Sequence, residues 1–154
     1  MSSEEFDSVT RQALRAVSYF VILISVLMLI PFPFWLILRA NMKSLNRDAF
    51  VSSAMFLFSI SMTGQLLIWL GMIVVGVAAL WTYRKTQNHG AQITVLRRGS
   101  LRLLPVLVWT VLIFINPIIY PDANFFGIPA LGGLILFGYG YYLLTLDRTP
   151  MAAE

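Results

Sequence analysis

The sequence of 154 residues has no cysteine and only one histidine, His89. Without cysteine the chain can form neither disulfides nor thiolate metal sites. One histidine cannot supply the ligand pair that holds haem between helices, or a histidine-rich metal cluster. We therefore predict no metal site and no cofactor, with bound lipids as the expected non-protein component.

Charge is also scarce. Charged residues make up 12% of the chain and hydrophobic residues 58%, and the mean hydropathy is +0.79. Soluble domains carry roughly a quarter charged residues, and a water-soluble globule of this size could not bury so much apolar surface. The composition predicts an all-α, polytopic integral membrane protein that forms one transmembrane domain over residues 1–154. The net charge of +4 is typical of basic cytoplasmic loops, so we predict no nucleic-acid partner.

Four apolar runs predict four transmembrane helices, at about residues 17–38, 66–83, 101–119 and 125–146. Before the first run, Ser2 and Glu5 have the spacing of a capping box. They predict a short amphipathic N-terminal helix at the membrane interface. Pro31 and Pro33 are expected to kink the first span near its far end, because proline removes a backbone donor.

The connections between the spans are less regular. Ala49 to Gln65 is uncharged and rich in hydroxyl groups, so it can extend the second span back to about residue 50, lie along the interface or re-enter as a hairpin. We favour a long, tilted or broken helix. Residues 84–99 are polar and predict a loop. The short turn at residues 121–124 predicts that the third and fourth spans are antiparallel neighbours forming a tight hairpin.

The distribution of Lys and Arg predicts the orientation. If the N-terminus is cytoplasmic, most basic residues lie inside, and only Arg39, Lys43 and Arg47 lie outside. The positive-inside rule therefore favours a plasma (inner) membrane protein with both termini cytoplasmic.

The predicted spans contain few side chains that could take part in catalysis or in ion transport. No acidic residue lies within them, and Arg102 lies only at the mouth of the third span. Proton relays and ion-coupled carriers ordinarily require an ionisable residue at depth. A serine–histidine–carboxylate triad cannot be assembled there either. We therefore predict no catalytic residues and no enzymatic activity.

Small residues mark two helix faces. Gly64, Gly71 and Ala78 recur at intervals of seven, as do Gly133 and Gly140, so each set lies along one side of its helix. Small residues let a second helix approach closely, which is the main source of packing energy between helices in lipid. We predict that these positions pack within the bundle or contact another subunit.

Polar groups on the predicted helices are the second set of candidates. Ser52, Ser59 and Thr63 share one face. They can line a polar path, or bond to carbonyls one turn earlier. Asn116 lies beside Pro117, where it can bond to carbonyls that the proline frees or to a neighbouring helix.

Two functions fit this pattern. The first is a non-catalytic accessory or assembly subunit of a larger membrane protein complex, whose partners are membrane lipids and other membrane subunits. The alternative is a self-associating channel, pore or small transporter.

Overall fold

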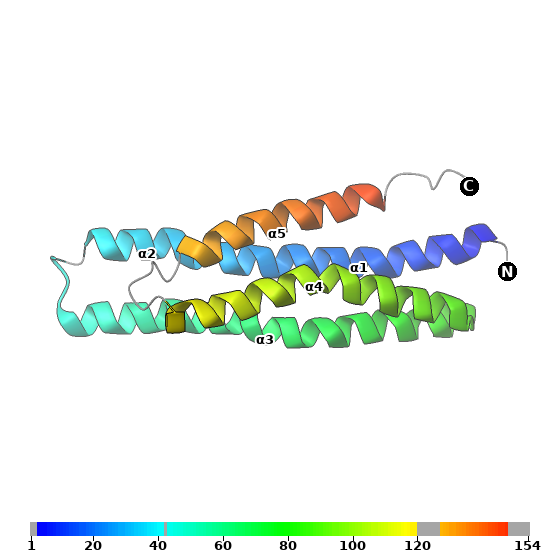
Figure 1. The fold of residues 1–154 in the computed structure, drawn as a ribbon, viewed down its shortest axis with the longest axis horizontal. Coiled ribbons are helices and arrows are strands. Elements are labelled where there is room, and N and C mark those ends of the chain that lie inside the picture. Colours follow the sequence, from blue (N-terminus) through cyan, green and yellow to red (C-terminus); the bar gives the residue numbers. More distant parts are fainter. Residues whose placement is uncertain (1–2, 42, 120–126, 148–154) are drawn as a thin grey trace.

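The computed structural model describes residues 3–41, 43–119 and 127–147, and these form helices and no strand. The helices are α1 (Ser3–Leu29), α2 (Pro31–Ala40), α3 (Arg47–Thr86), α4 (His89–Ile119) and α5 (Gly127–Leu146). They lie roughly along one long axis and form an elongated bundle (Figure 1). The predicted all-helical class is confirmed over this part of the chain.

Helix α1 is the centre of the bundle, because it contacts each of the other four helices. Its buried side chains at positions 17, 21, 24 and 28 repeat at helical spacing and form one wide apolar face. They meet Ile68 and Val75 of α3, Leu103 and Val106 of α4, and Leu136 of α5 in the main hydrophobic cluster. Helices that are distant in sequence therefore converge on α1.

The predicted N-terminal helix is present as the first part of α1, but its apolar face packs inside the bundle. Helix α1 is continuous from Ser3 to Leu29, and Val9, Ala13 and Leu14 are buried inside the bundle. No glycine or proline interrupts the segment, and the buried face of the apolar span continues back through these positions. Ser2, the predicted capping residue, lies outside the described residues.

The two prolines interrupt the first span where the sequence predicts it. Helix α1 ends at Leu29, and α2 begins at Pro31, with Ile30 between them. The Ile30 N–H donates to the Val26 carbonyl at 3.1 Å. Proline fits at the start of a helix because its missing N–H has no intrahelical acceptor there. Helix α2 therefore continues onward from α1, as Figure 1 shows.

Helix α3 includes the stretch from Ala49 to Gln65, whose conformation the sequence left open. This stretch is helical throughout and belongs to a single helix of 40 residues. At 1.5 Å per residue α3 is about 60 Å long, roughly twice the thickness of a hydrocarbon core. The helix that contains the predicted second span therefore extends back beyond residue 50.

Residues 84–99 do not form the predicted loop. Helix α3 ends at Thr86 and α4 begins at His89, so only Gln87 and Asn88 connect them. Gln87 adopts the left-handed conformation, with φ at 49°, and the Asn88 side chain accepts a hydrogen bond from the Gly90 N–H at 2.9 Å. The segment is helical because small and apolar positions one turn apart (91, 95 and 99) face the bundle, while its charges face outward.

Helices α4 and α5 run in opposite directions but contact each other over only a short stretch. Helix α5 instead lies along α1, with which it makes the most extensive interface in the bundle (Figure 1). The tight hairpin expected between the third and fourth spans is therefore not the main packing of α5. The turn predicted at residues 121–124 lies outside the described residues.

Two segments of the described chain are long and apolar enough to cross a membrane. They are residues 4–40, which cover α1 and α2, and residues 66–86 of α3. A shorter apolar stretch covers residues 130–146 of α5.

Candidate functional site

A buried ion pair joins α4 to the residue that follows α5. Two guanidinium nitrogens of Arg102 donate to the two carboxylate oxygens of Asp147, at 2.9 and 3.0 Å. The Arg102 side chain is 12% exposed and the Asp147 side chain 7%. Such a two-pronged, charge-assisted contact is among the strongest polar contacts in proteins, and it fixes the relative position of both groups.

The same ion pair also binds α1. Arg102 donates to the Leu14 carbonyl and to the Ser18 hydroxyl, both at 2.8 Å. Arg15 donates to the main-chain carbonyl of Asp147 at 3.2 Å. Three helices are therefore joined at one point, and the buried charges are compensated by one another and by several hydrogen bonds.

A polar cavity of about 370 Å³ lies beside this ion pair, between α1, α4 and the end of α5. Three guanidinium groups and two carboxylates line it, so charge of both signs surrounds it with a small excess of positive charge. Its lining residues are Phe6, Asp7, Thr10, Arg11, Leu14, Thr94, Arg98, Arg102, Leu146 and Asp147.

Thr10 is the exception among the buried hydroxyl groups. Ser18, Ser25, Thr82 and Thr110 each donate to the carbonyl four residues earlier. The Thr10 side chain is 6% exposed, yet its Oγ1 has no hydrogen-bond partner among the described residues. A buried polar group left unsatisfied costs about 1–3 kcal/mol, and this one lies in the wall of the polar cavity.

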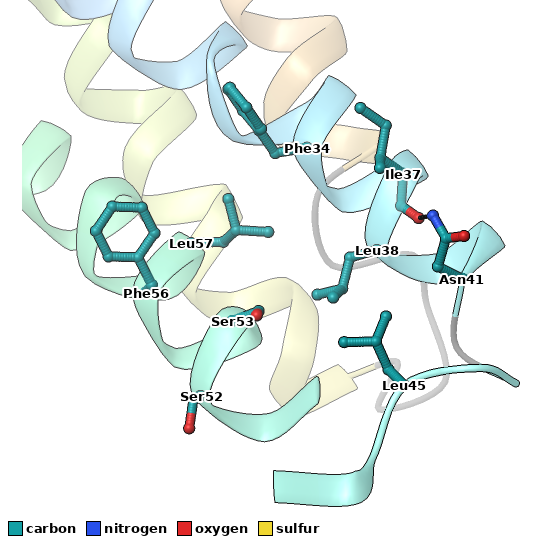
Figure 2. A pocket seen from close by; sticks show the side chains of 9 residues that line it. All are labelled: Phe34, Ile37, Leu38, Asn41, Leu45, Ser52, Ser53, Phe56 and Leu57. Atoms are coloured by element: carbon teal, nitrogen blue, oxygen red, sulfur yellow. Dashed lines mark hydrogen bonds between the residues drawn. The ribbon is translucent and has the colours of Figure 1, made fainter. Parts of the chain in front are cut away.

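The opposite end of the bundle carries an apolar groove of about 610 Å³ between α2 and the start of α3 (Figure 2). Its floor is formed by Leu38 and Leu57, which are buried against each other. Its walls include Phe34, Ile37 and Phe56, all of them exposed. None of the described residues that line the groove is charged; they are Phe34, Ile37, Leu38, Asn41, Leu45, Ser52, Ser53, Phe56 and Leu57.

The predicted small residues lie at close contacts within the chain. A Cβ atom added to Gly71 would lie 2.9 Å from the Phe20 ring, and one added to Gly140 would lie 2.6 Å from Ile22. A Cβ atom added to Gly133 would lie 3.0 Å from the Ser25 carbonyl oxygen. Ala78 is buried in a cluster with alanines of α1 and α3 and a valine of α4. Gly64 lies outside the residues whose surroundings are described.

The predicted polar face is directed away from the bundle. The Ser59 hydroxyl donates to the Phe56 carbonyl at 2.7 Å, and the Thr63 hydroxyl donates to the Ser59 carbonyl at 2.9 Å. Ser52 lies at the groove, with its hydroxyl pointing away from Leu38 and Leu57 (Figure 2). Two of the three hydroxyl groups are therefore bonded to their own helix. Asn116 lies outside the residues whose side chains are described.

Sequence reasoning missed the pairing of Arg102 with Asp147. The sequence did contain a clue: Arg102 lies at the start of the third predicted span and Asp147 follows the end of the fourth, so antiparallel spans place these opposite charges on the same side of the membrane. Their pairing depends on which helices are neighbours, and a local sequence pattern does not indicate which helices pack together.

In the described part of the chain, no three His, Cys, Asp or Glu side chains come together as possible metal ligands. His89 is exposed, with its ring centroid 5.1 Å from that of Tyr83. Among the cavities of the described residues, the polar cavity has the most charged lining and the apolar groove has the largest volume; a third, apolar hollow of about 420 Å³ lies between α1 and α3.

Comparison of the chain with known protein families, with curated proteins and with solved structures finds no match.

Proposed function

We propose that this protein is a non-catalytic accessory or assembly subunit of a larger membrane protein complex. The observation that supports the proposal best is the apolar groove between α2 and α3. Its floor is packed and its walls are exposed aromatic and aliphatic side chains, so it presents a shaped apolar surface without catalytic groups (Figure 2).

The occupant we propose for the groove is a transmembrane helix of the partner. In lipid, helices associate mainly through van der Waals contact, since the surrounding acyl chains are as apolar as the helices themselves. A hollow of about 610 Å³ accepts several side chains of such a helix, and each gains contacts that an unfilled groove does not offer. The small polar groups of Asn41 and Ser53 at the groove leave room for a close approach.

The proposed topology has four spans and two cytoplasmic termini. The spans are α1 with the start of α2, α3 extended back to about residue 50, α4 from about residue 101, and α5. The arrangement in Figure 1 supports this, because the start of α1, the α3–α4 connection and the end of α5 lie at the same end of the bundle. Basic residues outnumber acidic ones there, as expected for a cytoplasmic face.

Cysteine labelling tests this topology directly, because the chain has no cysteine of its own. Single cysteines at Ser44, Gly90 and Ala123 are treated with a membrane-impermeant reagent in intact cells. We expect labelling at positions 44 and 123 and protection at position 90. Protection of position 44 with labelling of position 90 would reverse the orientation.

The subunit proposal is tested by purifying the protein in a mild detergent and measuring the mass and stoichiometry of what it carries. We expect a hetero-complex with a second membrane protein at a fixed ratio. A pure homo-oligomer would contradict the proposal and favour the channel or pore alternative. A monomer that carries only lipid would contradict both.

The role of the groove is tested separately by photo-cross-linking. A photoreactive residue replaces Phe56 in the groove wall, and in a matched control it replaces Leu134, which is equally exposed on α5. We expect the Phe56 variant to cross-link the stoichiometric partner more efficiently than the Leu134 variant. Cross-links to lipid alone at Phe56 would show that the groove holds an acyl chain instead.

A further inference from the structure

The polar cavity at the other end of the bundle has features that the subunit proposal does not use. It lies where α5 ends, so α1 and α4 face each other there beyond the last turn of that helix. The Arg102–Asp147 pair closes one side of the cavity. This pair is satisfied by its own contacts, because Arg102 also donates to the Leu14 carbonyl and the Ser18 hydroxyl.

Two hydrogen-bond donors in the cavity wall have no partner among the described residues. Arg98 is exposed and makes no hydrogen bond or ion pair with any residue that the structure describes. The Thr10 hydroxyl is buried and has no acceptor, although every other buried hydroxyl in the described helices bonds back to its own helix. One free guanidinium and one free hydroxyl therefore line the same cavity from two helices.

We propose that this cavity binds a phosphate group, with the Arg98 guanidinium and the Thr10 hydroxyl as its donors. A phosphate presents several strong acceptor oxygens and a negative charge, which suits the forked donor of arginine. It would also give the Thr10 hydroxyl an acceptor, which none of the described residues provides.

The charge around the cavity permits an anion. Asp147 is neutralised by its contact with Arg102, and Asp7 lies one helical turn before Arg11 on α1. With Arg98 added, the lining retains an excess of one positive charge over its carboxylates. The binding energy of the anion is therefore not cancelled by the two acidic side chains.

The position of the cavity makes a lipid headgroup one natural source of the phosphate. Tyr141 and Tyr142 in the last turns of α5, and Tyr19 beside Ser18 on α1, are exposed near the level of the ion pair. Tyrosine is enriched at the membrane–water boundary, where headgroups lie. A free phosphate from the adjoining solution offers the same acceptor chemistry, so the test includes both sources.

The experiment uses the purified full chain in an uncharged detergent. It is titrated in one arm with inorganic phosphate and in a second arm with phosphatidylglycerol. Diacylglycerol with the same acyl chains is the control for apolar binding. Binding is measured by native mass spectrometry of retained lipid and by the shift in thermal midpoint. Binding in the phosphatidylglycerol arm alone assigns the site to a lipid headgroup, and binding in both arms assigns it to phosphate in general.

Two variants connect binding to the proposed donors. Arg98→Gln is compared with Arg97→Gln, which removes the same charge from an exposed neighbour that does not line the cavity. We expect Arg98→Gln to weaken binding about tenfold or more, the effect of one charge-assisted hydrogen bond, and Arg97→Gln to change it little. Thr10→Val should also weaken binding without lowering the thermal midpoint of the ligand-free protein, because the hydroxyl has no partner to lose.

Three results would overturn the proposal. The first is no binding in either arm. The second is equal weakening by Arg98→Gln and Arg97→Gln, which would indicate general attraction by a basic surface. The third is unchanged binding in Thr10→Val, which would show that the buried hydroxyl does not face the ligand.

Discussion

The two ends of the bundle are held together by different kinds of contact. At the end that carries Arg102, charge-assisted hydrogen bonds join α1, α4 and the residue after α5. At the end that carries α2, the contacts between α2 and α3 are apolar, built on Leu38, Leu57 and the rings of Trp35 and Phe50. The first end is tied by a few directional bonds, whereas the second leaves a groove open beside a small packed cluster.

This difference has a physical basis. Directional bonds hold helices in one arrangement, and removing one partner leaves the other charge buried and uncompensated. Apolar contacts between helices in lipid are weaker individually and can be exchanged for contacts with another helix. The polar end is therefore suited to fixing the bundle, and the apolar end is the one that we propose binds a partner. The following substitutions test this contrast in order of decreasing expected effect.

The largest effect is expected from Asp147→Asn at the polar end. The change leaves the buried Arg102 guanidinium without its carboxylate, so the free energy of unfolding should fall by about 3–5 kcal/mol. Unfolding in mixed detergent micelles measures this loss.

The control for that change is the double variant Arg102→Met with Asp147→Leu. It removes both charges together and should recover most of the stability, since buried pairs can often be replaced by apolar side chains. A double variant as unstable as Asp147→Asn would show that the hydrogen bonds to α1 matter more than the charge balance.

A smaller effect is expected on the contact between α4 and α5. In Gly132→Ala the new Cβ would overlap the Trp109 ring, so the variant should lose about 2 kcal/mol through overpacking. Gly138→Ala on the same helix is the matched control, because nothing lies within 4 Å of its added Cβ. That change should stabilise the helix by about 0.5–1 kcal/mol. Equal effects of the two variants on the thermal midpoint would contradict the close packing of Trp109.

A comparable or lesser loss is expected from Leu57→Ala in the floor of the groove. The side chain is buried, but the groove above it is open, so detergent or lipid can fill part of the space. We expect a loss of about 2 kcal/mol, at the low end for a buried leucine. A loss as large as that of Asp147→Asn would remove the proposed contrast between the two ends.

The smallest effect on stability is expected from Phe56→Ala. The side chain is 66% exposed, so the free energy of unfolding should change by less than about 0.5 kcal/mol. Retention of the stoichiometric partner during purification should fall, because the groove loses one wall. Leu134→Ala on α5 is the control and should retain the partner.

Much of the helical framework could be predicted from residue type alone. The third and fourth spans were predicted to end at residues 119 and 146, where α4 and α5 end. Long apolar runs with few charges are typical of helices that are buried or cross a membrane. The break at Ile30 could also be predicted from the sequence, because Pro31 and Pro33 lack backbone donors in any surroundings.

The polar segments were harder to predict. Residues 84–99 suggested a loop because their charges are dense, yet only Gln87 and Asn88 are outside a helix. The N-terminal residues suggested a short interfacial helix that leads into the first span, yet as part of α1 their apolar face packs inside the bundle. In both segments a few buried apolar positions on one side are enough for a helix to pack against its neighbours. The overall polarity of the segment hides these few positions.

The sequence by itself determined that the described part of the chain is helical, where its last two long helices end, and which small residues allow close packing. Only the tertiary structure decided that α5 lies along α1 rather than along α4, and that Arg102 therefore meets Asp147 and Ser18. The same packing left the Thr10 hydroxyl without an acceptor and opened a groove beside Leu57. The physical reason is that helix formation depends on neighbouring residues, whereas the choice of partner helix depends on contacts between residues far apart in the chain.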